Sequence, residues 1–79
     1  MATLRLFAGA REAAGTGRDT FDCPTVGGVL DEACVRYGEG FAAVVASSKV
    51  WRNGEPAERD DRLAAGDEVA VLPPVSGGA

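Results

Sequence analysis

The sequence contains no histidine, and its two cysteines, Cys23 and Cys34, lie eleven residues apart. Without histidine, the chain cannot build a Ser-His or Cys-His nucleophile pair from its own residues, nor the usual zinc sites that include histidine. The cysteine spacing fits neither a Cys-x-x-Cys redox motif nor half of a zinc site. We interpret both cysteines as small buried apolar groups, with a disulfide or a reactive thiol as the alternatives, and we expect no metal site.

Basic residues are fewer than acidic ones, at 8 against 12, and the net charge is −4. This balance argues against a nucleic-acid partner, which requires a basic surface to neutralise phosphates. No apolar run reaches the roughly 18 residues of a membrane-spanning helix. The start, Met1 to Arg5, lacks the basic segment and apolar stretch of a signal peptide. We therefore expect a soluble, cytoplasmic protein with no membrane partner.

The length of 79 residues, with 46% hydrophobic residues, predicts one folded domain. Its first strand is expected over Thr3 to Ala8, and its second over Arg18 to Cys23. Alternation places Leu4, Leu6, Ala8, Phe21 and Cys23 toward the core. Residues 9–15, bounded by glycines, form a loop or a short helical turn between the two strands. The pair is interpreted as a hairpin with a long loop.

The main helix is expected after Thr25, a suitable N-cap, and before Gly38, a natural helix stop. It carries an apolar stripe at helical spacing, made of Val26, Val29, Leu30, Ala33, Cys34 and Tyr37. Gly27 and Gly28 weaken its first turn by up to about 1 kcal/mol each. Phosphate binding by this glycine pair is an alternative, although no lysine stands at the spacing of a phosphate-binding loop.

The second half is expected to add a short helix over residues 40–47 and a strand over residues 49–53 that ends in an Asn53-Gly54 turn. An edge segment follows over residues 55–57, then a turn anchored by Leu63, and a final strand over residues 68–72 with Val69 and Val71 inward. A hairpin, a crossover helix and returning strands predict an α+β protein with a mixed sheet and one main helix across one face. This order is the β-grasp, or ubiquitin-like, arrangement, expected over residues 1–72.

The remaining residues, Pro73-Pro74-Val75-Ser76-Gly77-Gly78-Ala79, are expected to form a flexible C-terminal tail. The prolines stop the final strand and hold the chain extended, and the glycines carry no side chains. Such a segment suits threading through a narrow channel into another protein's active site. The alternative is an ordinary frayed terminus.

The chain resembles the MoaD/ThiS family of sulfur carriers, more its MoaD-like branch. The resemblance covers nearly the whole sequence and rests on Leu6-Phe7-Ala8 with Arg11-Glu12, on Asn53-Gly54-Glu55, on Gly66-Asp67-Glu68-Val69-Ala70, and above all on the Pro-Pro-Val-Ser-Gly-Gly segment. It implies that a ubiquitin-activating-like enzyme uses ATP to adenylate the carboxylate of Gly78, which then becomes a thiocarboxylate. Gly77 provides clearance for this group. The chain itself is then a carrier rather than an enzyme, and it binds no cofactor.

The resemblance also implies a sulfur-acceptor enzyme in the synthesis of molybdopterin, of cysteine or of a thio-metabolite such as a thiosugar. In the molybdopterin case, the resemblance implies that the carrier is the small subunit of molybdopterin synthase and that its tail enters the large subunit. Two other classes of function stay open: a ubiquitin-like modifier conjugated to lysines through Gly78, and a plain β-grasp interaction domain that never uses its tail.

Ala79 departs from the family pattern, which usually ends at the second glycine. Because the Gly78 carbonyl is held in an amide to Ala79, we expect the chain to be a precursor. By family resemblance, a zinc-dependent protease of the deubiquitinase kind is expected to remove Ala79. The alternative is a tolerated variant end.

A partner-binding surface is predicted near the base of the tail. Strand alternation places Phe7 and Leu72 outward on neighbouring strands and Trp51 outward on the third, and exposed apolar clusters mark interfaces. Arg11 matches a family position near the partner. The other predicted contacts are Leu63, Pro73 and Val75. The acidic run of residues 58–68 is interpreted as a solvated face, or else as a steering surface for a basic enzyme.

Overall fold

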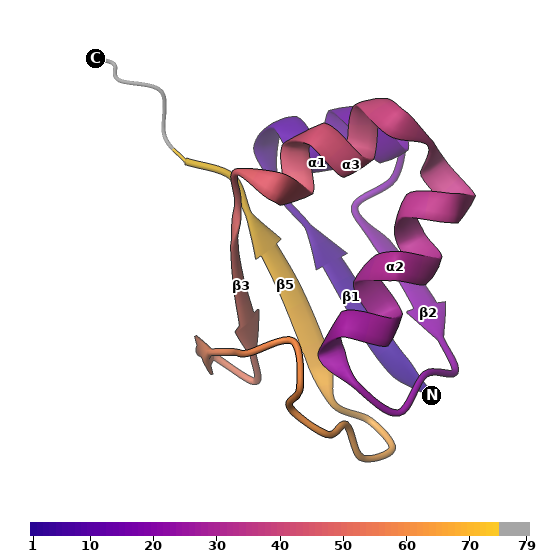
Figure 1. The fold of residues 1–79 in the computed structure, drawn as a ribbon, viewed down its shortest axis with the longest axis vertical. Coiled ribbons are helices and arrows are strands. Elements are labelled where there is room, and N and C mark those ends of the chain that lie inside the picture. The colour runs from indigo at the N-terminus through magenta and orange to yellow at the C-terminus, as the bar shows by residue number, and fades with distance from the viewer. Residues whose placement is uncertain (75–79) are drawn as a thin grey trace.

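The computed structural model describes residues 1–74 (Figure 1), so the part of the predicted tail beyond Pro74 lies outside the described residues. These residues form a five-stranded mixed sheet of order β2-β1-β5-β3-β4. β1 is parallel to β5, and the other neighbouring pairs are antiparallel. The helices and strands are, in chain order, β1 (Ala2–Leu6), α1 (Ala8–Ala14), β2 (Arg18–Phe21), α2 (Val26–Tyr37), α3 (Glu39–Ala46), β3 (Lys49–Arg52), β4 (Glu55–Pro56) and β5 (Glu68–Leu72).

The core lies between the sheet and α2, which crosses one face of it (Figure 1). Alternation along β1 and β5 buries every second side chain against the helices, as the sequence pattern predicts. Phe41 of α3 is fully buried, and its ring meets Tyr37 of α2 edge to face at 5.1 Å between centroids. The largest fully buried side chains are Phe21, Phe41, Leu4, Val26, Val29, Val69 and Val71.

Helix α2 begins and ends where its capping residues predict. The Thr25 side-chain oxygen accepts a hydrogen bond from the Gly28 amide at 3.0 Å. At the other end, Gly38 adopts φ 97°, which favours glycine, and donates its amide to the Cys34 carbonyl at 2.9 Å.

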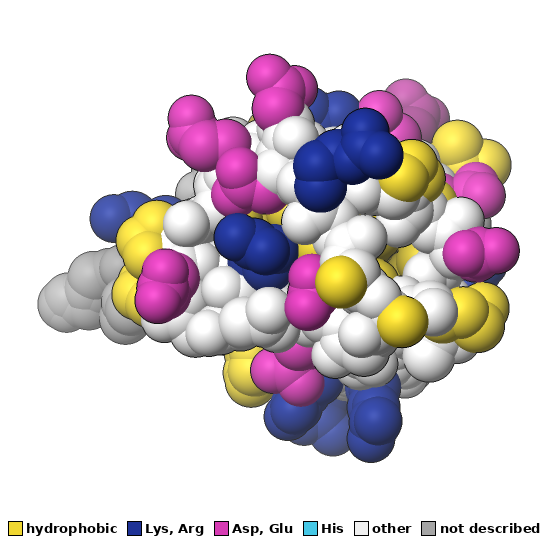
Figure 2. All heavy atoms as spheres, turned by 90° about the horizontal axis from the view of Figure 1, so that it is seen from below, with side chains coloured by type: hydrophobic (Ala, Val, Ile, Leu, Met, Phe, Trp, Pro, Cys, Tyr) yellow, Lys and Arg dark blue, Asp and Glu magenta, His cyan; other side chains and the backbone are white. Residues whose placement is uncertain are grey.

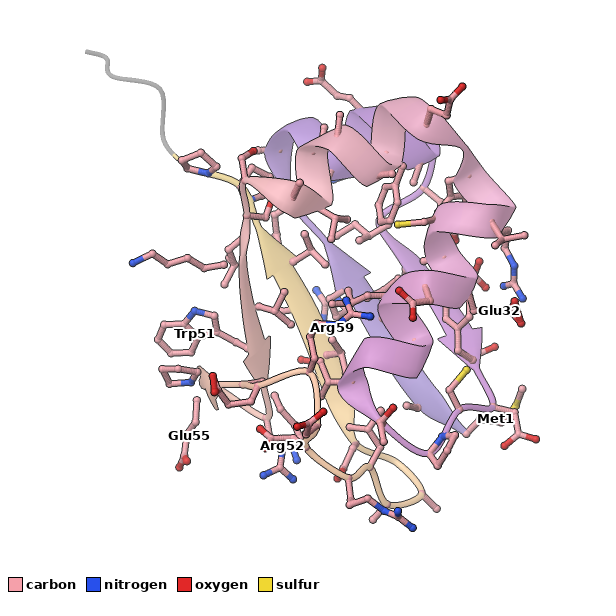
Figure 3. The ribbon with its side chains drawn as sticks, in the orientation of Figure 1. Met1, Glu32, Trp51, Arg52, Glu55 and Arg59 are labelled. Carbon is pink, nitrogen blue, oxygen red and sulfur yellow. The ribbon has the colours of Figure 1, made fainter. Side chains whose placement is uncertain are left out.

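A loop from the second half of the chain closes over the first turn of α2. The amide of Gly27 donates to the Arg59 carbonyl at 2.9 Å, and that of Val26 donates to the Asp61 carbonyl at 3.0 Å. The Arg59 guanidinium reaches across to Asp31 of α2 at 2.7 Å, as its position between loop and helix in Figure 3 shows. The amides of the first turn are therefore occupied, and the phosphate-binding interpretation of the glycine pair is wrong.

The first strand is shorter than predicted, because it ends at Leu6 rather than Ala8. Ala8, expected to face the core, is exposed, with φ 48°, and starts α1. The carbonyl of Phe7 accepts the amides of Ala10 and Arg11, at 3.0 and 3.3 Å, so Phe7 caps a helix instead of extending the strand.

The other boundaries differ by one or two residues. β2 ends at Phe21 rather than Cys23, because Phe21 already pairs with Ala2, the first residue of β1. α3 lies one residue earlier than expected, and β3 stops before Asn53. Asn53 and Gly54 both have positive φ, 51° and 84°, as a tight hairpin turn between β3 and β4 requires. β4 includes Pro56 but not residue 57.

Candidate partner-binding surface at the base of the tail

The tail leaves the molecule from the middle of the sheet. β5, which precedes it, pairs with β1 on one side and with β3 on the other, so both edges of the strand are hydrogen-bonded. Pro73 and Pro74 follow directly, and proline cannot continue the backbone ladder. The point of departure is thereby fixed by two neighbouring strands. The predicted site residues Val75, Gly77 and Gly78, together with Ala79, lie outside the described residues.

The face of the sheet opposite the core carries a continuous cross-strand row. Arg18 is opposite Arg5, Arg5 is beside Ala70, Ala70 is opposite Trp51, and Trp51 is opposite Pro56. Their neighbours along the strands, Leu4, Val69 and Val71, are buried on the other side. We call the surface defined by this row of five residues the outer face of the sheet.

Phe7 stands at the end of β1, where the tail begins. Its exposed fraction is 39%, which is high for a phenylalanine. The Arg5 guanidinium lies over its ring, 5.7 Å from the centroid. The parallel register sets Leu6 beside Val71, so the residues that follow, Phe7 and Leu72, leave the sheet at the same end.

Trp51 and Leu72 face outward as alternation predicts, although each is half-buried. Val50, between Lys49 and Trp51, pairs with the buried Val71, which leaves Trp51 on the outer face. Figure 3 shows the indole projecting outward from β3. Leu72 is opposite Lys49, so an apolar and a basic side chain adjoin at the tail end of the sheet.

The structure separates the remaining predicted contacts. Arg11 is exposed on α1, and its side chain lies against Gly17, where an added Cβ would meet Nε at 3.3 Å. Leu63 packs against the core, and its amide donates to the Pro24 carbonyl at 2.8 Å. It is therefore next to the start of α2, away from the tail, and is not brought together with Phe7 and Leu72.

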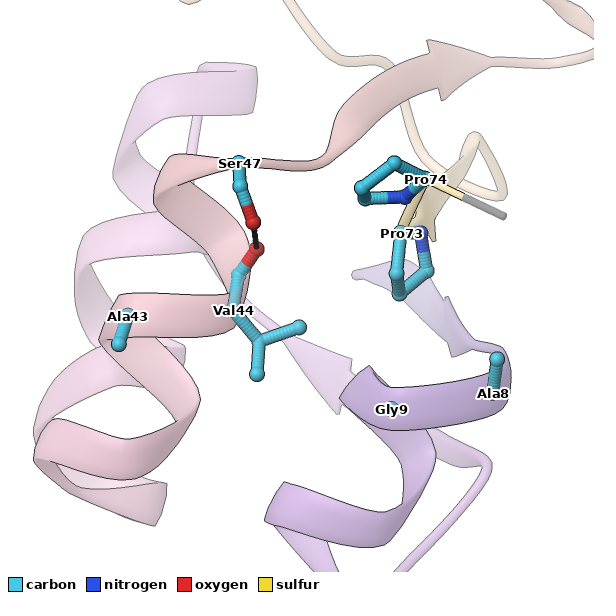
Figure 4. A pocket seen from close by; sticks show the side chains of 7 residues that line it. All are labelled: Ala8, Gly9, Ala43, Val44, Ser47, Pro73 and Pro74. Carbon is cyan, nitrogen blue, oxygen red and sulfur yellow. Dashed lines mark hydrogen bonds between the residues drawn. The ribbon is translucent and has the colours of Figure 1, made fainter. Parts of the chain in front are cut away.

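An apolar groove adjoins the base of the tail on the helix side and was not anticipated from the sequence (Figure 4). It has a volume of about 650 Å³ and is lined by Ala8, Gly9, Ala43, Val44, Ser47, Pro73 and Pro74. Small residues at the start of α1 and at the end of α3 keep it open. The sequence did not predict this groove, because alanine and glycine on short helices are just as common where helices simply pack together.

Both thiols are half-buried and free. Burial raises the pKa of Cys23 and of Cys34 above the ordinary thiol value, and neighbouring carboxylates add to the rise in each case. The thiolate is the nucleophilic form, so both cysteines are poorly activated at neutral pH. The cysteines were interpreted as small buried apolar groups, and the structure agrees in part, because both pack against the core but are only half-buried. No disulfide joins them.

Within the acidic run, Asp67 has a local structural role. Its carboxylate accepts the Ala64 amide at 2.8 Å and the Asn53 side-chain amide at 3.0 Å, and these hydrogen bonds lower its pKa. Glu68 pairs with Arg5 across the strands at 3.4 Å. No helix of residues 1–74 is long and apolar enough to cross a membrane.

The element order, the central parallel β1–β5 pair and the helix across one face define a β-grasp, ubiquitin-like protein. The ThiS family matches residues 4–78, which is nearly the whole sequence. The chain therefore belongs to the ThiS family, and the resemblance inferred from its motifs is confirmed.

Two relatives match the chain over most of their length. Small archaeal modifier protein 1 of Haloferax volcanii is 37% identical, over 94% of this chain and 97% of the relative. The molybdopterin synthase sulfur carrier subunit of Aedes aegypti is 38% identical, over 95% of this chain and 86% of the relative. A crystal structure of SAMP1 from Haloferax volcanii superposes with a TM-score of 0.82 at 36% identity and covers 98% of both chains.

Proposed function

We propose that this protein is a sulfur carrier whose reactive group is the carboxylate of Gly78. The observation that carries the proposal is the family match that extends through residue 78, because it includes the paired glycines that follow the tail's prolines. The 38% identity to a molybdopterin synthase sulfur carrier subunit supports the same function.

The proposed chemistry has three steps. Hydrolysis of the peptide bond between Gly78 and Ala79 frees the carboxylate, and a zinc-dependent protease is the proposed agent. The carboxylate then attacks the α-phosphorus of ATP and displaces pyrophosphate, which converts a poor electrophile into an acyl adenylate. Hydrosulfide released by a sulfur donor attacks the carbonyl carbon, AMP leaves with the bonding electron pair, and loss of the S–H proton leaves a thiocarboxylate.

In this proposal the chain positions the Gly78 carboxylate and does not catalyse the reaction itself. It has no histidine, and burial disfavours the thiolate form of both cysteines, so acids, bases and nucleophiles come from the partners. Gly77 lets the tail enter a narrow channel, because it has no side chain. The prolines at 73 and 74 cannot continue the hydrogen-bonded ladder of the sheet, so the final strand ends at Leu72.

The proposed partners are a ubiquitin-activating-like adenylating enzyme and a sulfur-acceptor enzyme. Both need access to the same carboxylate, so we propose that both dock on the surface at the base of the tail. Phe7, Leu72 and Trp51 supply its apolar contacts, with Arg11, Pro73 and Val75 at its border. Molybdopterin synthesis is the acceptor pathway that the sulfur carrier relative favours, whereas cysteine and thio-metabolite synthesis use the same carrier chemistry.

A second candidate function is protein modification. The 37% identity to a small archaeal modifier protein favours it, and conjugation also begins with adenylation of Gly78. A lysine amine then replaces hydrosulfide as the attacking group, and an isopeptide bond forms. Incubation with the activating enzyme and cell extract separates the two functions, because a ladder of covalent adducts arises only from conjugation.

Adenylation is tested by ATP–pyrophosphate exchange with the adenylating enzyme of the same organism. The 1–78 form is expected to support exchange and the 1–79 form is not, because an added residue moves the carboxylate by about 3.5 Å along an extended chain. Equal exchange by both forms would overturn the requirement for Ala79 removal. Absence of exchange with both forms would overturn the proposed function itself.

A further inference from the structure

Two arginines stand directly opposite each other on the outer face of the sheet. Arg5 of β1 and Arg18 of β2 are cross-strand partners in an antiparallel pair. Like charges at such positions destabilise a sheet, whereas opposite charges stabilise it. Arg5 is offset by Glu68 at 3.4 Å, with both side chains more than 40% exposed. Among the described residues, Arg18 has no acidic partner. The arrangement costs stability in the isolated chain.

A third arginine, Arg11, lies near the same edge of the sheet but on its other side. The side chain of Arg11 lies against Gly17, the residue immediately before Arg18. The backbone holds that loop in place, since the Leu6 amide donates to the Gly17 carbonyl at 3.0 Å. Gly17 is therefore the cross-strand partner of the inward-facing Leu6, and Arg11 lies on the helix side of the sheet. Of the three arginines, Arg5 and Arg18 alone share the outer face, and we call this pair the arginine strip.

The strip stands out because the chain as a whole is acidic, with a net charge of −4. In Figure 2, one group of lysine and arginine side chains lies at the lower edge of the molecule, and others lie among the acidic side chains of its upper part. Acidic side chains also lie on α2, where Asp31 pairs with Arg59 of the loop that packs on this helix. Arg18 therefore keeps a positive charge on a negatively charged protein, since none of the acidic side chains of residues 1–74 pairs with it.

We propose that the arginine strip docks on a carboxylate-rich surface of the adenylating enzyme, beside the apolar contacts of Phe7 and Trp51. The inference rests on the proposed function. It predicts an acidic docking surface on the enzyme, whereas the acidic run of residues 58–68 would have called for a basic one. Charge complementarity of this kind raises the rate of association and selects the partner. A nucleic acid is the less suitable occupant, because the net negative charge of the chain repels phosphates.

The test compares Arg18→Glu with Arg62→Glu, each in the 1–78 form. Arg62 is an exposed loop arginine next to Thr25 of the α2 cap, and its substitution changes the net charge by the same amount. Association with the adenylating enzyme is followed by stopped flow at low and at physiological ionic strength. Arg18→Glu is expected to slow association about tenfold at low salt and less at high salt, while Arg62→Glu changes it by about twofold or less. Arg18→Lys is expected to restore the rate.

Thermal unfolding supplies a readout that needs no partner. Because Arg18→Glu replaces a like-charge pair with an opposite-charge pair, Tm is expected to stay constant or to rise by about 1 to 4 °C. A folded, equally stable variant that binds slowly would support docking through the strip. A fall in Tm would show that Arg18 stabilises the folded chain instead of being repelled by Arg5, and this result would overturn the inference.

Equal association rates for the two glutamate variants would overturn the inference and leave the proposed function intact. Tighter binding of a single-stranded DNA oligonucleotide than of the enzyme would overturn it in favour of a nucleic-acid partner. Pyrophosphate exchange at a saturating concentration of the 1–78 form reports the tail chemistry separately, and Arg62→Glu is expected to retain it. Failure of exchange with the unaltered 1–78 form would count against the proposed function, whatever the association rates show.

Discussion

Phe7 combines two roles that one substitution separates. It ends β1 and caps α1 through its carbonyl, while its side chain makes no capping hydrogen bond and is 39% exposed. Phe7→Asp is expected to leave the fold intact, because aspartate is a favoured N-cap residue that offsets the lost apolar contact. Binding to the adenylating enzyme is expected to weaken by about 2 kcal/mol or more, since an unpaired charge enters an apolar interface.

Circular dichroism and calorimetric titration with the enzyme check this prediction together. Val35→Asp is the matched control, because Val35 is an 82% exposed apolar residue on α2. It introduces the same charge away from the outer face and should leave affinity unchanged. A collapsed Phe7→Asp fold, or equal affinities for the two variants, would contradict the assignment of Phe7 to the interface.

At the scale of elements, the contact between α2 and the Arg59 loop depends on a missing side chain. A Cβ at Gly27 would lie 3.1 Å from the Arg59 carbonyl oxygen, which the Gly27 amide itself holds. Gly27→Ala is therefore expected to lower the free energy of unfolding by about 1 to 3 kcal/mol, through overpacking against backbone.

Gly40 in α3 provides the control for Gly27. Nothing lies within 4 Å of a Cβ added there. Gly40→Ala is expected to raise the free energy of unfolding by up to about 1 kcal/mol, through helix propensity alone. Urea denaturation of both variants measures the difference. Equal effects of the two substitutions would show that the Arg59 loop gives way without cost.

The attachment of α2 to β2 predicts a dependence of stability on pH. Asp19 accepts hydrogen bonds from the Tyr37 hydroxyl and, at 2.9 Å, from Arg36. Chiefly through Tyr37, these contacts lower the pKa of Asp19 below its ordinary value of 3.8. Because the folded-state pKa is depressed, this stabilisation is present at neutral pH and is lost as pH falls below about 4.

Asp19→Asn removes the charge and keeps the shape. It is expected to lower the free energy of unfolding by about 1 kcal/mol or less at pH 7, since the pair is partly exposed to solvent. The difference from the unaltered chain should shrink as the pH falls through the acidic range. Urea denaturation at neutral and at acidic pH measures it. A difference that stays constant with pH would exclude Asp19 as the titrating group.

At the scale of the whole molecule, sequence patterns predicted the architecture because its elements are locally encoded. Alternation in β5 and the Thr25 cap of α2 each specify a local structure, and together they leave the β-grasp as the consistent arrangement. The end of β1 was predicted two residues too late, since alternation continues through Ala8 and conceals the helix that starts there.

Contacts between segments far apart in the chain could not be predicted, because no local sequence pattern encodes them. The Arg59 loop on Gly27 joins residues 32 positions apart, and the pairing of Arg5 with Arg18 depends on a register that alternation alone does not fix. The groove beside Pro73 and Pro74 likewise arises only when α1 and α3 meet the end of the sheet. The strand register and the groove belong to the proposed partner surface, so the candidate site was less predictable than the fold.

The most direct measurement of the central claim is mass spectrometry of the C-terminal peptide. The 1–78 form is incubated with the adenylating enzyme, ATP and a sulfur donor. Its cysteine-free variant, Cys23→Ala with Cys34→Ala, is treated in parallel and is expected to lose some stability but no sulfur transfer. The account predicts that both forms gain the mass difference between sulfur and oxygen, located on Gly78. Sulfur added to Cys23 or Cys34, or a variant that folds but acquires none, would contradict it.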